Sequence, residues 1–130
     1  MPVDPRGSDL KRFLAEDDGG PVVMLNLLKF AAGGRVGYEQ YARRIQPFLA
    51  AAGADVLYLG DTSTALGAPE GHDWDAVLLV SYPSRAAFSA MVADPAYQEI
   101  TPLRSAALSD AVLQATVPWG GAGDRVGGTS

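Results

Sequence analysis

The chain has 130 residues, a formal net charge of −5 at pH 7 and no cysteine. The lack of cysteine excludes disulfides, thiolate metal sites and cysteine nucleophiles, and the acidic excess argues against a nucleic-acid partner. No apolar run approaches the roughly 20 residues that span a bilayer, so we expect a cytoplasmic protein without a membrane partner. We expect a single domain over residues 1–130, with an ordered core at 8–117 and flexible ends at 1–7 and 118–130.

The most apolar stretch of the chain is Val22–Phe30, which carries Asn26 in its middle. Its apolar residues fall on both faces of a strand, so both faces must be covered. A short helix is expected before this strand, with Ser8 or Asp9 as its cap and a stop at 19–21. The apolar stripe of that helix consists of Leu10, Phe13 and Leu14.

Apolar residues at helical spacing predict the next helix, from Tyr38 to about Ala52. Pro47 lies inside this helix and is expected to kink it, because proline removes one hydrogen bond of the ladder. Gly53 is expected to end the helix.

Alternating side chains predict two more strands, at 55–62 and 74–82, joined by a polar loop. Both carry apolar residues on both faces. In the strand at 55–62, Val56 and Tyr58 are expected on one face and Leu57 and Leu59 on the opposite face.

In the last third of the chain, the sequence predicts two helices and a strand. Ser84 is expected to cap a helix over 85–93. Asp94 and Pro95 form a cap and a first helical position, so a further helix begins there and runs to about residue 109, with an interruption near Pro102. The final strand is expected at 111–117.

The predicted order is a helix followed by β-α-β-β-α-β, the ferredoxin-like arrangement of an α+β fold. Right-handed crossovers place the first and third strands at the centre of a four-stranded antiparallel sheet. Helices cover one face of this sheet. The other face would expose several large apolar side chains, so we expect a second copy of the chain to cover it in a homodimer.

Three segments together resemble the domain-of-unknown-function 1330 family: VVMLNLLKF, YEQYARRIQPFLAAAGADVLYLGD and WDAVLLVSYPSRAAFSAMVADPAYQEITPLRSAAL. The resemblance covers about residues 21–117 and is most specific at Asn26, at Tyr38 and Tyr41, and at 97–104. That family belongs to the dimeric α/β-barrel superfamily. The resemblance therefore implies a homodimer with its sheets face to face and a cavity between sheet and helices in each subunit.

The same resemblance leaves the chemistry open. Relatives in the superfamily include cofactor-free monooxygenases, muconolactone isomerases, polyketide cyclases and haem-binding chlorite dismutases. A fold shared by such different activities does not define a reaction. Site residues must therefore be argued one at a time.

Asn26 is polar among apolar neighbours, so its amide needs partners. It can hold a ligand carbonyl or hydroxyl in the cavity, or it can bond to a nearby loop or helix end. Tyr38 and Tyr41 lie one helical turn apart and share a face. Their phenols can act on a ligand oxygen or carry protons, or the rings can pack with their hydroxyls reaching the surface.

Arg104 follows Tyr97 by two helical turns, which favours a common face. Its guanidinium can clamp a carboxylate or enolate, and it can favour an ionised tyrosine nearby. The alternative is an ion pair with one of three acidic residues, Asp94, Glu99 or Asp110.

His72 is the single histidine and a candidate general base, although a solvated place in the loop is the alternative. Together with Glu70 and Asp73 it resembles a set of metal ligands, but the spacing fits no standard ligand motif, so we predict no metal. The glycine-rich stretch 32–37 resembles the fingerprint of a dinucleotide-binding loop. It lacks the first glycine of that fingerprint, and the chain offers no further parallel βαβ units, so we predict no cofactor.

We therefore predict a small cofactor-independent enzyme of the isomerase, cyclase or monooxygenase type, acting on a hydrophobic, oxygenated metabolite. The alternatives are a non-catalytic small-molecule-binding dimer and a purely structural dimer whose pocket is filled by its own side chains. The expected catalytic residues are Asn26, Tyr41, His72 and Arg104. The expected substrate-binding residues are Met24, Tyr38, Phe88 and Tyr97.

Overall fold

A computed structural model describes residues 5–119, and its centre is a four-stranded antiparallel sheet in the order β2-β3-β1-β4. The strands are β1 (Val22–Phe30), β2 (Asp55–Asp61), β3 (Ala76–Tyr82) and β4 (Leu108–Thr116). The helices are α1 (Gly7–Ala15), α2 (Gly34–Arg44), α3 (Gln46–Ala52), α4 (Arg85–Ala93), α5 (Pro95–Gln98) and α6 (Thr101–Ala107). The ferredoxin-like α+β prediction is confirmed, including the central place of the first and third strands.

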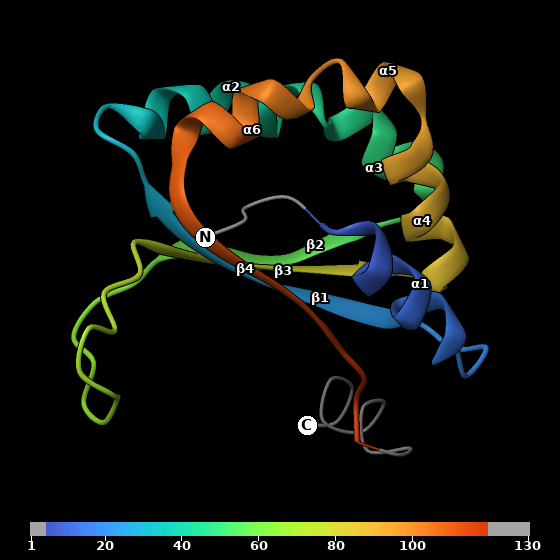
Figure 1. Cartoon of the computed structure of the whole chain (residues 1–130), viewed down its shortest axis with the longest axis horizontal. Coiled ribbons are helices and arrows are strands. Elements are labelled where there is room, and N and C mark those ends of the chain that lie inside the picture. Colours follow the sequence, from blue (N-terminus) through green and yellow to red (C-terminus); the bar gives the residue numbers. More distant parts are fainter. Residues whose placement is uncertain (1–4, 120–130) are drawn as a thin grey trace.

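Helices α2 to α6 lie on one side of the sheet (Figure 1). Helices α2 to α6 form an arch over it, and α1 lies under the arch beside α4. The loop between β2 and β3 extends to the opposite side. None of the helices at residues 5–119 is long and apolar enough to cross a membrane.

Strand β1 shows why one face of the sheet forms the core. Its even-numbered residues from Val22 to Leu28 are buried, and its odd-numbered residues are half-buried. Because successive side chains of a strand point to opposite faces, the even set lies under the helices and the odd set on the open face. Val22 and Leu28 are fully buried.

Local signals define several helix ends as predicted. The Ser84 side chain accepts a hydrogen bond from the Ala87 amide at 3.0 Å. The Asp94 side chain accepts one from the Ala96 amide at 2.9 Å. Pro47 takes one of the first positions of α3, so the expected kinked helix is two helices that meet at Ile45. Pro102 takes the same place in α6.

The predicted start of the first helix was wrong. Helix α1 begins at Gly7 and has no side-chain cap, and Asp9 lies in its first turn, 3.0 Å from Arg6. Asp9 pairs with the Arg6 side chain and does not cap the helix. The helix ends at Ala15, and Leu14 is exposed rather than part of the apolar stripe. The flexible ends predicted for 1–7 and 118–130 lie mostly outside the described residues.

Helix α2 begins at Gly34, four residues earlier than predicted, because two glycines allow a close approach to α6. Gly33 has φ +70°, a region that favours glycine. A β-carbon on Gly34 would overlap the carbonyl oxygen of Ala107, which also accepts a hydrogen bond from the Ala31 amide at 2.8 Å. The glycine thus lets α2 pack directly against the end of α6.

The face assignment predicted for the 55–62 strand was also wrong. The register with β3 shifts between Val56 and Tyr58, so Leu57 has no partner of its own in the pairing. Val56 pairs with Val80 and Leu59 with Leu78, both on the helix side, while Tyr58 pairs with Leu79 on the open face. This β-bulge reverses the alternation beyond residue 57.

The open face of the sheet carries large apolar side chains, and helices α2 to α6 lie on the other side of the sheet (Figure 1). Leu25 pairs with Leu79, and Leu27 lies between Val77 and Val112. Tyr58 is 54% exposed in the single chain. We call this surface, formed by Val23, Leu25, Leu27, Tyr58, Val77, Leu79 and Val112, the open-face patch.

Candidate functional site

A cavity of about 510 Å³ lies between the sheet and the helical arch. This volume is within the range of small-molecule pockets, roughly 300–1,000 Å³. The cavity brings together most of the residues singled out from the sequence. Seven of them line it: Met24, Asn26, Tyr38, Tyr41, Phe88, Tyr97 and Arg104.

Regular periodicity explains how residues so far apart in sequence meet. Met24 and Asn26 lie two residues apart on β1 and face the helices. Tyr38 and Tyr41 lie one turn apart on α2 and are both buried, with ring centroids 5.5 Å apart. Arg104 comes from α6, which packs against α2 (Figure 1).

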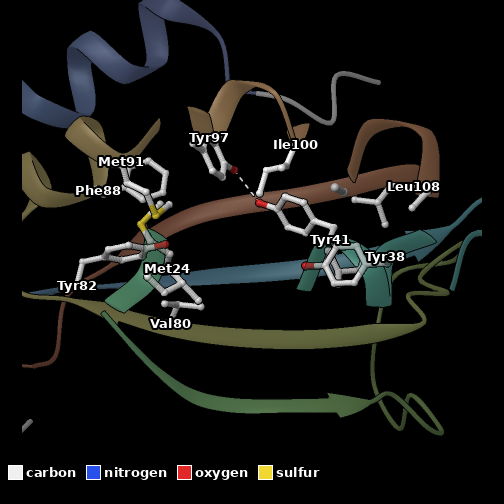
Figure 2. Close-up of a cluster of buried hydrophobic side chains, with 14 of the residues drawn as sticks. Met24, Tyr38, Tyr41, Val80, Tyr82, Phe88, Met91, Tyr97, Ile100 and Leu108 are labelled. Carbon is white, nitrogen blue, oxygen red and sulfur yellow. Dashed lines mark hydrogen bonds between the residues drawn. The ribbon is translucent and has the colours of Figure 1, made fainter. Parts of the chain in front are cut away.

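The two phenols of Tyr41 and Tyr97 form the most specific contact of the site. Their hydroxyl oxygens are 2.7 Å apart, a short hydrogen bond in which either can be the donor (Figure 2). Both side chains are buried. The pair connects α2 to α5 across the cavity and gives it a polar centre.

Burial dominates the ionisation of the cavity phenols. It raises the pKa of Tyr41 well above the usual range, the neighbouring Tyr97 raises it further, and the positive charge of Arg104 acts in the opposite direction. Burial likewise raises the pKa of Tyr38, against the effect of Arg104. The ionised tyrosine considered from the sequence is therefore disfavoured. At neutral pH these phenols are protonated and can donate hydrogen bonds.

The raised pKa values predict a loss of stability in alkali. Above about pH 10 the phenols of the unfolded chain release protons, whereas the buried phenols of the folded chain keep theirs. The free energy of unfolding should therefore be constant up to about pH 9 and then fall, by about 1.4 kcal/mol per pH unit for each such phenol. Denaturant unfolding from pH 8 to 11 measures this slope. Tyr41→Phe should reduce it, and an equal slope in both proteins would contradict the assignment.

Arg104 carries the one formal charge among the described residues that line the cavity. Its side chain is 6% exposed. A guanidinium presents several donors in one plane, which suits the two oxygens of a carboxylate or the oxygen of an enolate.

Asn26 is 7% exposed and donates its side-chain amide to the Met24 carbonyl at 3.4 Å. This distance is long for a hydrogen bond, so the contact is weak. A ligand oxygen at normal distance can replace it at little cost. The structural and ligand-binding roles considered for this residue are therefore compatible.

His72 does not join the site. It is exposed, lies within the β2–β3 loop, and is not among the described residues that line the cavity. The loop instead contacts the sheet through its neighbour Asp73, which lies 2.7 Å from Lys29. Within residues 5–119, no group of three or more His, Asp or Glu side chains could hold a metal ion.

The sequence reasoning missed some lining residues. Tyr82 is buried at the end of β3, and its ring packs edge-on against Phe88 with centroids 5.1 Å apart. Extending the alternation of β3 by one step beyond Val80 would have found it. Gln98 and Thr101 also line the cavity, but they flank the break between α5 and α6, where no simple period applies.

The edge strand β2 leaves the cavity accessible. Val56 and Leu59 line it and are 45% and 55% exposed. Because these residues belong to both the cavity wall and the surface, the cavity opens along β2.

The fold and the cavity define an α+β protein of the ferredoxin-like class. The chain belongs to the family described as Domain of unknown function (DUF1330), whose model matches residues 28–116. Helix α1 and most of β1 lie outside that match. No protein with a curated description matches the chain significantly.

Solved structures give the same architecture. A protein of unknown function from Rhodopseudomonas palustris is 32% identical, with a TM-score of 0.83, over 91% of this chain and 97% of its own. SnoaB, a cofactor-independent oxygenase from Streptomyces nogalater, is 14% identical, with a TM-score of 0.57, over 78% of this chain and 95% of its own. A dimeric ferredoxin-like protein of unknown function from Thermobifida fusca is 16% identical, with a TM-score of 0.52, over 77% of this chain and 92% of its own.

Proposed function

We propose that the protein is a small cofactor-independent enzyme that binds a hydrophobic, oxygenated metabolite in the cavity, with an isomerase, cyclase or monooxygenase type of reaction. The observation that carries this proposal is the hydrogen-bonded pair of Tyr41 and Tyr97 beside the buried Arg104. Proton donors and a cation enclosed together can stabilise negative charge that develops on a substrate oxygen.

Each polar residue has a role in this proposal. Arg104 and Asn26 would polarise a carbonyl and stabilise the enolate formed from it. Tyr41 would donate a hydrogen bond to the same oxygen, because its phenol stays protonated at neutral pH. Met24 and Phe88 would contact the apolar part of the substrate. His72 has no part, since it lies outside the cavity.

The shared fold of SnoaB agrees with this proposal but does not carry it, because 14% identity supports architecture alone. The alternative is a module that sequesters a small ligand without catalysis, using the same residues. A cavity of about 510 Å³ argues against the purely structural dimer, in which side chains of the protein would fill the pocket.

We also propose that the protein is a homodimer in which the open-face patches of two copies meet. The patch leaves contiguous apolar side chains half-buried or exposed in the single chain, and a twofold axis lets one surface cover itself. Two structures that share the fold, from Thermobifida fusca and Bacteroides fragilis, are described as dimeric.

Turnover of aromatic and polyketide metabolites, screened with the purified protein, tests the enzymatic proposal. For any compound that is converted, Tyr41→Phe should lower kcat by about 100-fold, because it removes one proton donor and leaves the ring in place. Circular dichroism should show an unchanged fold. Steady-state kinetics at pH 7 measures the effect.

Tyr58→Phe is the matched control, since Tyr58 lies on the other face of the sheet. It should keep the wild-type kcat. A ligand that raises the unfolding temperature without being converted would favour the binding module. Equal kcat in Tyr41→Phe and the wild type would remove Tyr41 from the mechanism.

A further inference from the structure

The two ends of the cavity differ in chemistry. Helices α2 and α6 run in opposite directions side by side (Figure 1), and a β-carbon on Gly37 would lie 3.6 Å from the β-carbon of Ala107. Arg104 precedes Ala107 by one turn, so it lies beside the turn of α2 that follows Gly37. That turn carries Tyr38 and Tyr41. We call Arg104 with these two tyrosines the polar end.

The other end is apolar. Figure 2 shows Met24, Val80, Phe88 and Met91 gathered together, away from Tyr38. All four are buried. Thioether and aromatic groups such as these adapt to apolar ligands of varied shape. We call these four residues the apolar end.

A single buried cation makes the polar end selective for charge. None of the described residues that line the cavity is acidic. Interactions between charges are several times stronger in such an enclosed site than in water, so an anion gains more there than a neutral group of the same shape. The guanidinium fork matches the two oxygens of a carboxylate.

We propose that the natural ligand is an amphipathic organic acid, whose carboxylate binds Arg104 at the polar end and whose hydrocarbon body extends toward Met24 and Met91. This inference rests on the proposed use of the cavity as a ligand site and adds the class of ligand. It does not depend on whether the ligand is converted.

The experiment compares acids with neutral compounds of the same shape. Phenylpropanoate and phenylpentanoate are titrated into the full-length protein by calorimetry at about pH 7, where both carboxylate and guanidinium are charged. Their primary amides are titrated in parallel. The acids should bind at least about tenfold more tightly than the amides.

Two variants of one residue test the origin of this preference. Arg104→Gln should remove the difference between acid and amide, whereas Arg104→Lys should keep part of it because the charge remains. Arg43→Gln is the matched control, since Arg43 is exposed on α2 and does not line the cavity. It should bind like the wild type.

A change at the apolar end tests the direction of the ligand. Met91→Trp fills that end, so it should weaken phenylpentanoate by about fivefold or more and phenylpropanoate less. Equal loss for both acids would place the hydrocarbon body elsewhere and overturn the orientation.

The outcomes separate this inference from the proposed enzyme. Amides that bind as well as acids in the wild type, or no binding by either acid, would overturn the inference whatever the variants do. Acid binding that depends on Arg104, with no turnover of any compound, would support the inference and count against the enzyme. Turnover of neutral compounds, without turnover of acids, would support the enzyme and count against the inference.

Discussion

Leu25→Glu is expected to convert the proposed dimer to a monomer. Leu25 lies on the central strand β1, on the open face, directly opposite Leu79 on β3. In a dimer with a twofold axis each substitution occurs twice at the interface. Burying an unpaired carboxylate in place of leucine costs about 3 kcal/mol at each site, so the dissociation constant should rise by about ten-thousandfold.

Sedimentation velocity at micromolar concentration measures this change. Val36→Glu is the control, because Val36 is 65% exposed on α2, on the helical side of the molecule. This variant should stay dimeric. A wild-type protein that sediments as a monomer, or a Leu25→Glu variant that stays dimeric, would refute the open-face patch as the interface.

Gly34→Ala is expected to destabilise the fold by about 3 kcal/mol or more. A β-carbon on Gly34 would overlap the carbonyl oxygen of Ala107, which is backbone and cannot turn aside. That carbonyl is also held by the Ala31 amide at 2.8 Å. Helices α2 and α6 would have to separate, which would move Arg104 away from Tyr38 and weaken ligand binding as well.

The neighbouring Gly37 provides a matched control on the same helix. A β-carbon there would meet the Ala107 side chain at 3.6 Å, an ordinary contact. Gly37→Ala should therefore be neutral or stabilise the protein by up to about 1 kcal/mol, since alanine favours the helix. Urea unfolding of both variants measures the difference. Equal stability of the two variants would show that α2 and α6 can separate without cost.

Much of the fold could be predicted because local signals agreed with the packing. The bounds of β1, Val22–Phe30, match the apolar run, and Ser84 and Asp94 cap helices where predicted. The start of α1 could not be predicted from caps, because the helix begins without a side-chain cap and Asp9 pairs with Arg6 instead.

The candidate site could be predicted in part for the same reason. Alternation on β1 and helical spacing on α2 place Asn26, Tyr38 and Tyr41 on buried faces. His72 was a candidate on chemistry alone, with no period to place it, and it lies outside the cavity. Tyr82 was missed although its strand carried the signal.

The order of strands and helices, the choice of the two central strands and the apolar character of both their faces follow from the amino-acid sequence alone. Periodicity and capping are short-range properties, so neighbouring residues suffice to reveal them. Three features follow only from the packing of distant elements. Tyr41 and Tyr97 share a hydrogen bond, a bulge at Leu57 turns Leu59 into the cavity, and Gly34 lets α2 approach α6. Each of these contacts joins separate elements across space, and no local pattern encodes the distance between them.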